Sequence, residues 1–166
     1  INFFLAIVNT FHNEDYFPKQ ELLSFSPLLI INYLVETHRY YRNYILPKLE
    51  KQLDALISGC EEKCDELNMI DAFYKRYKRE LLNHLKEEEE MVFPYVKALV
   101  NQSGTERFNY RIKHFEKEHS NVEEQLNDLK NLLLKYLKPV YSDNDCNEFL
   151  FTLFNFEKDI TDHARI

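Results

Sequence analysis

Apolar residues recur every three or four positions along most of this chain, which is the period of an amphipathic helix. The repeat extends over four long segments and predicts helices at residues 27–57, 67–101, 104–138 and 143–166. The links between these segments are short, so consecutive helices should run antiparallel. A shorter apolar segment precedes them and predicts a short N-terminal helix. We therefore expect an all-α fold, an up-down-up-down four-helix bundle.

Residues that favour helix ends or interrupt helices divide these segments. Ser26 is expected to cap the first long helix, because Pro27 suits the first helical position, where its missing N–H costs nothing. Pro94 lies inside the second helical segment and predicts a kink there. Ser103 and Glu106 have the spacing of a capping box and predict the start of the third helix.

The chain divides into two predicted parts. Residues 1–25 are interpreted as a short N-terminal helix and connection, the remnant of a preceding module, and residues 26–166 as the bundle. The chain begins at Ile1 and stops inside a predicted helix, so we expect a fragment whose last helix is truncated. A shortened last helix would expose core, and two chains could then pair as a homodimer or exchange helices to cover it.

Composition narrows the class of protein. The 166 residues carry 21 Lys and Arg against 28 Asp and Glu, a formal charge of −7, which argues against nucleic-acid binding by this domain itself. No apolar run approaches the roughly 20 residues of a membrane-spanning helix. Only 2 Gly and 5 Pro argue against an all-β fold. Three cysteines without a secretory leader favour the reducing cytoplasm.

Each long helix places one histidine on its apolar seam, where water is excluded. These residues are His38, His84, His119 and His163, and Glu88 follows one turn after His84. Counted from the helix ends, the histidines of the first three helices lie at levels that agree within about 9 Å. Several polar groups at one level of a core would be costly without a partner, and a bound metal ion removes that cost. Imidazole and carboxylate ligands suit iron, manganese or zinc, and carboxylate bridges with several histidines suit a di-iron pair.

The remaining polar and aromatic residues near these positions have simpler interpretations. We expect Glu87, Glu89 and Glu90 to form a solvated helix face, and His12 and His114 to lie on the surface or next to the site. The tyrosines expected in the core or near the site are Tyr40, Tyr41, Tyr77 and Tyr95. Cys60 and Cys64 are interpreted as incidental thiols.

Four motifs at these positions resemble the hemerythrin-like (HHE cation-binding) family. The most specific is the stretch from His84 through Glu88 to Phe93-Pro94. The others are the stretch from His38 to Arg42 (His-Arg-Tyr-Tyr-Arg), Glu118-His119, and the segment ending at His163. Within the family the motifs look closest to iron-centre-repair proteins and to hemerythrin-like bacterial transcription regulators.

The resemblance implies two non-haem iron ions, with the four histidines as terminal ligands and Glu88 as a bridging carboxylate. Two departures from the family pattern stand out. A second bridging Glu would lie one turn beyond His163, after Ile166. The repair proteins also use a fifth histidine where this chain has the Cys60-Glu61 neighbourhood, so that position could stay open, take a water or recruit one of these two residues.

A di-iron centre with an open position can bind O₂, NO or peroxide. The resemblance therefore implies a sensor of O₂, NO or redox state within a transcription regulator, a binding domain rather than an enzyme, with no catalytic residues. Two alternatives remain open: an iron-sulfur centre repair protein acting under nitrosative stress, and an oxygen carrier.

Overall fold

The computed structural model describes residues 2–12, 16–59, 65–102, 112–136 and 143–166, without the side chains of residues 11, 12, 112–121, 123 and 143. Helices make up most of these residues, and no strand occurs among them. The all-α prediction is confirmed. In the described part of the chain, no helix combines the length and the apolar character needed to cross a membrane.

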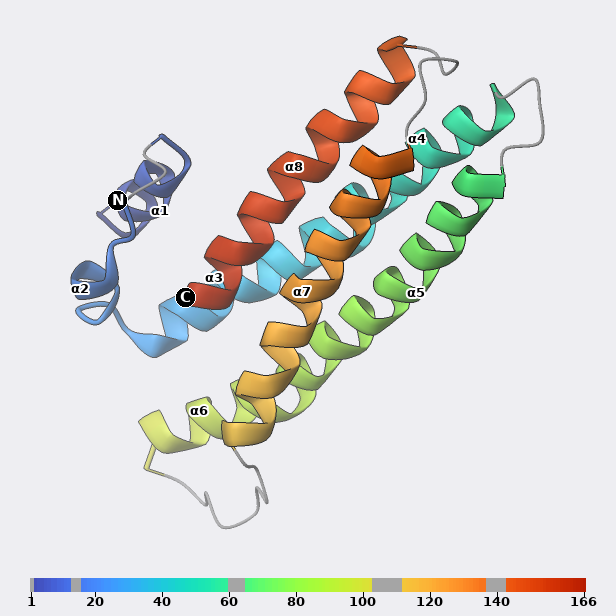
Figure 1. The fold of residues 1–166 in the computed structure, drawn as a ribbon. Helices are drawn as coiled ribbons and strands as arrows, with labels where there is room; N and C mark the ends of the chain where they lie inside the picture. The colour runs from blue at the N-terminus through green and yellow to red at the C-terminus, as the bar shows by residue number, and fades with distance from the viewer. Residues whose placement is uncertain (1, 13–15, 60–64, 103–111, 137–142) are drawn as a thin grey trace.

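The described residues form four helical rods that lie side by side (Figure 1). In chain order the rods are α3 (Pro27–Tyr40), η1 (Tyr41–Ile45) and α4 (Leu46–Ser58); α5 (Asp65–Glu87), η2 (Glu88–Val92) and α6 (Phe93–Val100); α7 (Ile112–Tyr136); and α8 (Asp143–Arg165). Helix α4 packs against α5 and α8, and α7 packs against the same two helices. Each rod therefore contacts its neighbours in the sequence, and the first contacts the last, as predicted for an up-down-up-down bundle.

The start of the first rod follows the sequence signals. Ser26 has extended backbone angles and Pro27 occupies the first helical turn, although the Ser26 side chain makes no capping hydrogen bond. The rod ends at Ser58, just before Gly59. The capping box predicted at residues 103–106 lies outside the described residues.

Two short helices precede the bundle. The predicted N-terminal helix is α1 (Asn2–His12). The connection expected over residues 13–25 contains a second helix, α2 (Lys19–Leu22), which the sequence interpretation missed. Its single turn is too short to show an amphipathic period, and Leu22 is the residue of this turn that is buried.

Aromatic contacts connect this N-terminal segment to one end of the bundle. The Phe3 ring meets the Tyr33 ring edge-on at 5.5 Å between centroids. The Arg165 guanidinium lies 4.0 Å above the centre of the Phe17 ring. The segment is thereby attached both to α3 and to the last turn of α8.

Each of the first two rods contains one π-helical turn immediately before a proline. Pro47 lies in the first turn after η1, and Pro94 in the first turn after η2. A proline cannot donate a hydrogen bond to the carbonyl four residues earlier, and its ring crowds that carbonyl. A wider turn, with hydrogen bonds five residues apart, relieves this conflict. The interruption predicted at Pro94 takes this form.

The wide turn in the second rod moves its buried seam by one residue. We expected Met91 or Val92 to follow Glu88 on the buried face. Val92 is only partly buried, whereas Phe93, five residues after Glu88, is 5% exposed and Met91 is 40% exposed. The most buried position after Glu88 is therefore five residues later, because a π turn needs five residues to return to the same face.

The buried apolar residues form two clusters along the bundle axis. The larger occupies the length of the rods from the α4–α5 end to Tyr41 and Leu85. The smaller consists of Ile31, Leu34 and Phe93, with flanking residues, near the start of α3. His38, Glu88 and His163 fall between the two clusters in the sequence of their rods, and His84 lies next to Leu85 at the end of the larger cluster, so a polar layer separates two apolar ones.

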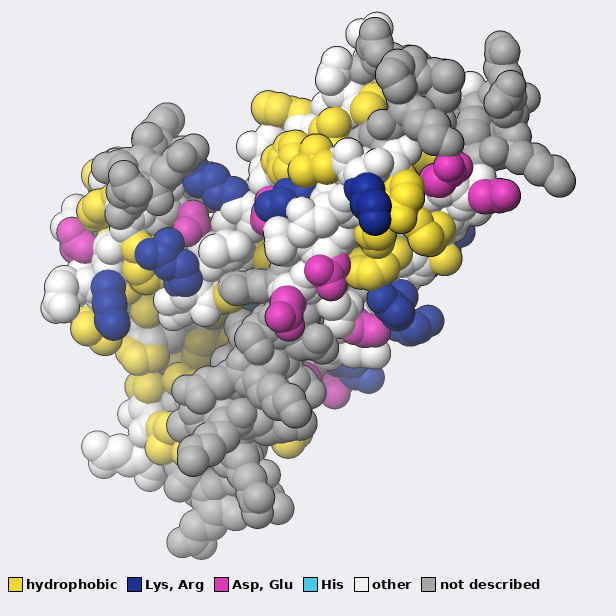
Figure 2. Space-filling view, in the orientation of Figure 1, with side chains coloured by type: hydrophobic (Ala, Val, Ile, Leu, Met, Phe, Trp, Pro, Cys, Tyr) yellow, Lys and Arg dark blue, Asp and Glu magenta, His cyan; other side chains and the backbone are white. Residues whose placement is uncertain are grey.

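The outer surface is mixed in charge. On the face drawn in Figure 2, the coloured Lys and Arg side chains are interspersed with Asp and Glu. Some large apolar side chains are exposed as well, among them Phe151 at 71% and Leu134 at 58%. The polar layer inside the bundle differs from this surface, because the carboxylate of Glu88 in that layer is buried.

Candidate metal centre

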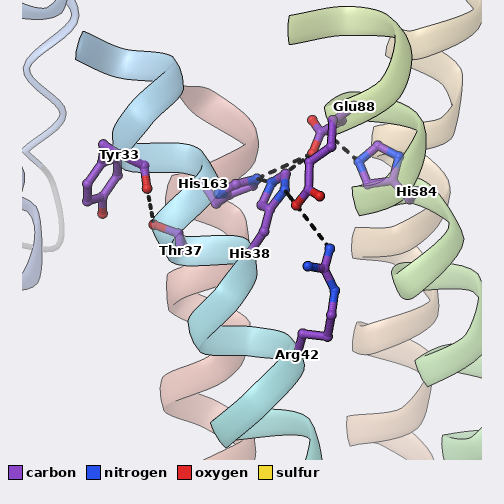
Figure 3. A network of polar contacts seen from close by, with 8 residues as sticks. Tyr33, Thr37, His38, Arg42, His84, Glu88 and His163 are labelled. Carbon is purple, nitrogen blue, oxygen red and sulfur yellow. Dashed lines mark hydrogen bonds and ion pairs between the residues drawn. The ribbon is translucent and has the colours of Figure 1, made fainter. Parts of the chain in front are cut away.

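A buried carboxylate and an imidazole meet between the first two rods. His38 on α3 is 0% exposed and Glu88, the first residue of η2, is 3% exposed. The Nε2 atom of His38 lies 3.0 Å from Oε2 of Glu88. Figure 3 shows both side chains pointing inward from their helices.

Two further histidines flank the same carboxylate. The Nε2 atom of His163, from α8, lies 3.7 Å from Oε2 of Glu88 and 3.2 Å from Nε2 of His38. The Nε2 atom of His84, one turn earlier on α5, lies 3.7 Å from the other oxygen, Oε1. Histidines from three rods therefore surround Glu88, and its two oxygens face different imidazoles.

The donor chemistry of this cluster suits a cation. One nitrogen each from His38 and His163 and one Glu88 oxygen lie within 4.8 Å of one another, and all three residues are buried. Two imidazole nitrogens that face each other beside a carboxylate concentrate electron pairs away from water, an arrangement that a metal ion stabilises. Imidazole and carboxylate donors fit iron, manganese and zinc.

A protein-family model described as Hemerythrin HHE cation binding domain matches residues 29–166. This chain belongs to the hemerythrin family. The two other comparisons, with curated proteins and with solved structures, found no match. The predicted family is confirmed, and its hallmark of cation binding agrees with the cluster around Glu88. The closer resemblance to repair proteins or to regulators stays a prediction.

Several residues of the expected hemerythrin site cannot be placed. His119 belongs to α7, but its side chain lies outside the described residues, as do those of His12 and His114. The Cys60–Glu61 neighbourhood, proposed for the missing fifth histidine, also lies outside them. Of the five predicted ligands, the structure brings four together, and the ligand role of each stays a prediction.

Glu89 corrects one of our interpretations. We assigned it to a solvated face together with Glu87 and Glu90, but its Oε1 atom lies 2.9 Å from Nδ1 of His38. Glu90 does lie on the surface, where Lys86 is its neighbour at 3.8 Å. The π turn explains the error, because widening the helix at Glu88 lets both Glu88 and Glu89 reach the polar layer that contains the buried histidines. The available signal was Pro94, which favours such a turn.

The tyrosines near the site divide into buried and exposed groups. Tyr41 and Tyr77 are buried as expected, whereas Tyr40 is 46% exposed and stacks on Tyr44. The assignment of Tyr40 to the core or the site was therefore wrong, since it lies on the outer side of the helix. Tyr41 contacts the site directly, and its ring meets that of His163 edge-on at 5.7 Å.

An acidic residue with altered acidity lies one turn before His163. Burial raises the pKa of Asp159 to about 6, interaction with the Tyr41 hydroxyl lowers it, and the negative charge of Asp162 raises it. Burial also raises the pKa of Tyr41 well above its usual value, and the Asp159 charge adds to that effect. At neutral pH the Tyr41 hydroxyl therefore keeps its proton, and Asp159 titrates closer to neutrality than an exposed aspartate does.

An apolar groove leads to the histidine layer from the end of the bundle where α3 begins. It has a volume of about 260 Å³ and reaches Glu88 and His163. Its walls include Ile31, Leu34 and Phe93. An apolar lining of this kind favours small uncharged solutes over charged ones, which would lose their hydration there.

Proposed function

We propose that this hemerythrin domain holds two non-haem iron ions and senses O₂, NO or redox state as part of a bacterial transcription regulator. The observation that carries the proposal is the position of Glu88, whose two oxygens face His84 on one side and His38 with His163 on the other. A carboxylate with imidazoles at both oxygens suits a bridge between two metal ions.

The buried histidines and Glu88 would have different roles in holding such a centre. His38, His84 and His163 would supply neutral nitrogen donors, and Glu88 would supply the negative charge that balances part of the cationic charge. When bound, iron would provide one-electron chemistry and a position open to a small ligand. The apolar layers on both sides keep bulk water away and strengthen the electrostatic attraction between Glu88 and a cation.

The groove supports a small uncharged ligand. O₂ and NO lose little hydration when they enter a channel lined by Ile31, Leu34 and Phe93, whereas a charged solute would lose its hydration shell. Peroxide, being uncharged at neutral pH, could follow the same path. The groove thus favours diatomic ligands over ionic ones.

Helix α8 supports a sensing role because its last turn makes two contacts. His163 in this turn belongs to the candidate centre, and Arg165 in the same turn covers the Phe17 ring. Sensing requires a site whose occupancy is coupled to another element. A displacement of His163 would be transmitted to the N-terminal segment through one helical turn.

The decisive experiment is anaerobic loading of this chain with Fe(II), followed by measurement of iron per chain and of optical spectra before and after O₂ or NO. We expect two iron ions per chain in the unsubstituted protein and a loss of iron in Glu88→Gln. Asn83→Ala, an exposed change on the same helix, is the matched control and should keep its iron. Absence of iron from the folded protein would refute the proposal.

Sensing itself needs a second measurement. Hydrogen exchange of residues 16–25 and 155–166 should change when NO or O₂ is added to the iron-loaded protein. Iron binding with unchanged exchange in both segments would instead favour the carrier alternative.

A further inference from the structure

The outward-facing nitrogen of His38 has a partner of its own. While Nε2 faces Glu88, Nδ1 lies 2.9 Å from Oε1 of Glu89. The same Oε1 atom accepts a hydrogen bond from the Arg42 guanidinium at 3.0 Å. The result is a chain of contacts from Arg42 through Glu89 to His38 that ends at the candidate metal centre.

We propose that Glu89 and Arg42 are positioning residues that fix the ring orientation and the tautomer of His38 and thereby set how strongly its Nε2 atom binds metal. This inference rests on the proposed function, because it assigns roles around the same centre. Neither residue is expected to touch the metal. They act through His38.

The role follows from hydrogen-bond direction. A carboxylate only accepts hydrogen bonds, so Glu89 holds a proton on Nδ1 of His38 and leaves the lone pair of Nε2 directed at the centre. A carboxylate behind a ligand histidine also makes that histidine a stronger electron donor. His38 is 0% exposed, so little water competes with Glu89 for the Nδ1 proton.

Arg42 limits this effect. Its guanidinium shares the oxygen that faces His38 and neutralises part of the Glu89 charge, so Glu89 pulls on the Nδ1 proton less strongly than an isolated carboxylate would. The side chains of Arg42 and Glu89 are 39% and 30% exposed, which places the pair at the edge of the site. Glu89 and Arg42 therefore act on His38 in opposite directions.

The two π turns explain why these residues can meet. Arg42 is the second residue of η1 and Glu89 the second residue of η2. In each rod the wide turn lets an additional side chain point toward the neighbouring rod. The ion pair therefore joins the two irregular turns next to the candidate ligands His38 and Glu88, and such turns occur often at functional sites.

The test compares Glu89→Gln and Arg42→Gln with two surface controls. Glu90→Gln removes the neighbouring carboxylate, whose side chain is 63% exposed. Arg39→Gln removes a cation one turn before Arg42. The Arg39 side chain is 61% exposed. Each protein is loaded with Fe(II) and, separately, with Zn(II), and the measurements are metal affinity by chelator competition and the midpoint potential of the iron-loaded form.

We expect Glu89→Gln to weaken the binding of either metal by about 10- to 100-fold and to raise the midpoint potential, because a less electron-rich His38 stabilises oxidised iron less. Arg42→Gln should lower the potential, because an unopposed Glu89 makes His38 more electron-rich. Opposite shifts in the two variants, with both controls unchanged, support a role through His38. A merely structural role would not change sign between them.

The outcomes separate this inference from the proposed function. If the unsubstituted protein binds iron and Glu89→Gln behaves as Glu90→Gln does, the positioning role is wrong and the metal centre stands. If it binds zinc but not iron, the proposed function fails while the zinc affinities still decide the positioning role. If it binds neither metal, both are overturned. Should Glu89→Gln fail to fold, as seen by loss of helicity, Arg42→Gln decides alone by the sign of its potential shift.

Discussion

Glu88 and His38 contact each other at 3.0 Å from two rods that each contain a π turn beside the contact. The contact brings a charged group and a ring nitrogen into a layer from which apolar residues exclude water. Such a pair is expensive to bury, and a bound cation would offset the cost. Metal binding and stability should therefore be coupled in this protein.

Stability should rise when metal is added, and the rise should depend on Glu88. A ligand that binds only the folded state stabilises it by about 2.7 kcal/mol at a free concentration 100 times Kd. Thermal unfolding with and without Fe(II) or Zn(II) should therefore show a metal-dependent increase in Tm for the unsubstituted protein. We expect none for Glu88→Gln and an undiminished increase for Glu90→Gln. An equal increase in all three proteins would remove Glu88 from the ligand set.

Asp159 should make stability depend on pH in a defined direction. Its pKa is about 6 in the folded protein against 3.8 for an ordinary aspartate, so between these values the folded state binds more protons than the unfolded state. Stability from this group is therefore present below about pH 4 and is lost as the pH rises toward 6. At pH 7, Asp159→Asn should have a higher free energy of unfolding than the unsubstituted protein. The difference between the two proteins should shrink toward pH 4.

Urea unfolding of metal-free protein at several pH values measures this difference directly. Asp145→Asn, on the same helix but in the far half of α8, is a suitable control. A difference between the unsubstituted protein and Asp159→Asn that stays constant from pH 4 to 7 would contradict the raised pKa.

Tyr74 should contribute to stability without affecting metal. Its hydroxyl is buried and donates a hydrogen bond to the backbone carbonyl of Leu46 at 2.6 Å. Removing the donor in Tyr74→Phe leaves that carbonyl with one partner fewer and should cost about 0.5–1.5 kcal/mol. Tyr44→Phe, at a residue that is 54% exposed, should change the free energy of unfolding little. Metal content should be the same in both, and a loss of metal in Tyr74→Phe would mean that the two regions are coupled.

Narrowing the apolar groove should slow ligand entry. Val96 lines the groove, and Val96→Phe adds bulk there without replacing a candidate ligand. In stopped-flow mixing of iron-loaded protein with NO, we expect a slower approach to the final spectrum at unchanged iron content. Val100→Phe, at a residue that is 41% exposed on the same helix, is the control. Equal rates in the two variants would show that ligands enter by another path.

The sequence interpretation named four residues that the structure brings together and misassigned Glu89 beside them. His38, His84, Glu88 and His163 were found because each lies on the apolar seam of a regular helical segment. Glu89 was assigned to the surface, because a regular helix turns consecutive residues about 100° apart and only one of them can face the core. The wide turn at η2 breaks this rule.

The apolar period and the helix-end signals by themselves determined the class of fold, the order of the rods and the presence of a histidine in the seams of the first, second and fourth rods. Those features are local, since burying one face of a helix requires the same spacing whatever the neighbours are. The tertiary structure alone decided that Phe93 follows Glu88 in the core, that Leu22 makes a further helical turn and that Arg42 meets Glu89 across two rods. Each of these depends on contacts between segments distant in the chain, and the helical period carries no information about which side chains meet there.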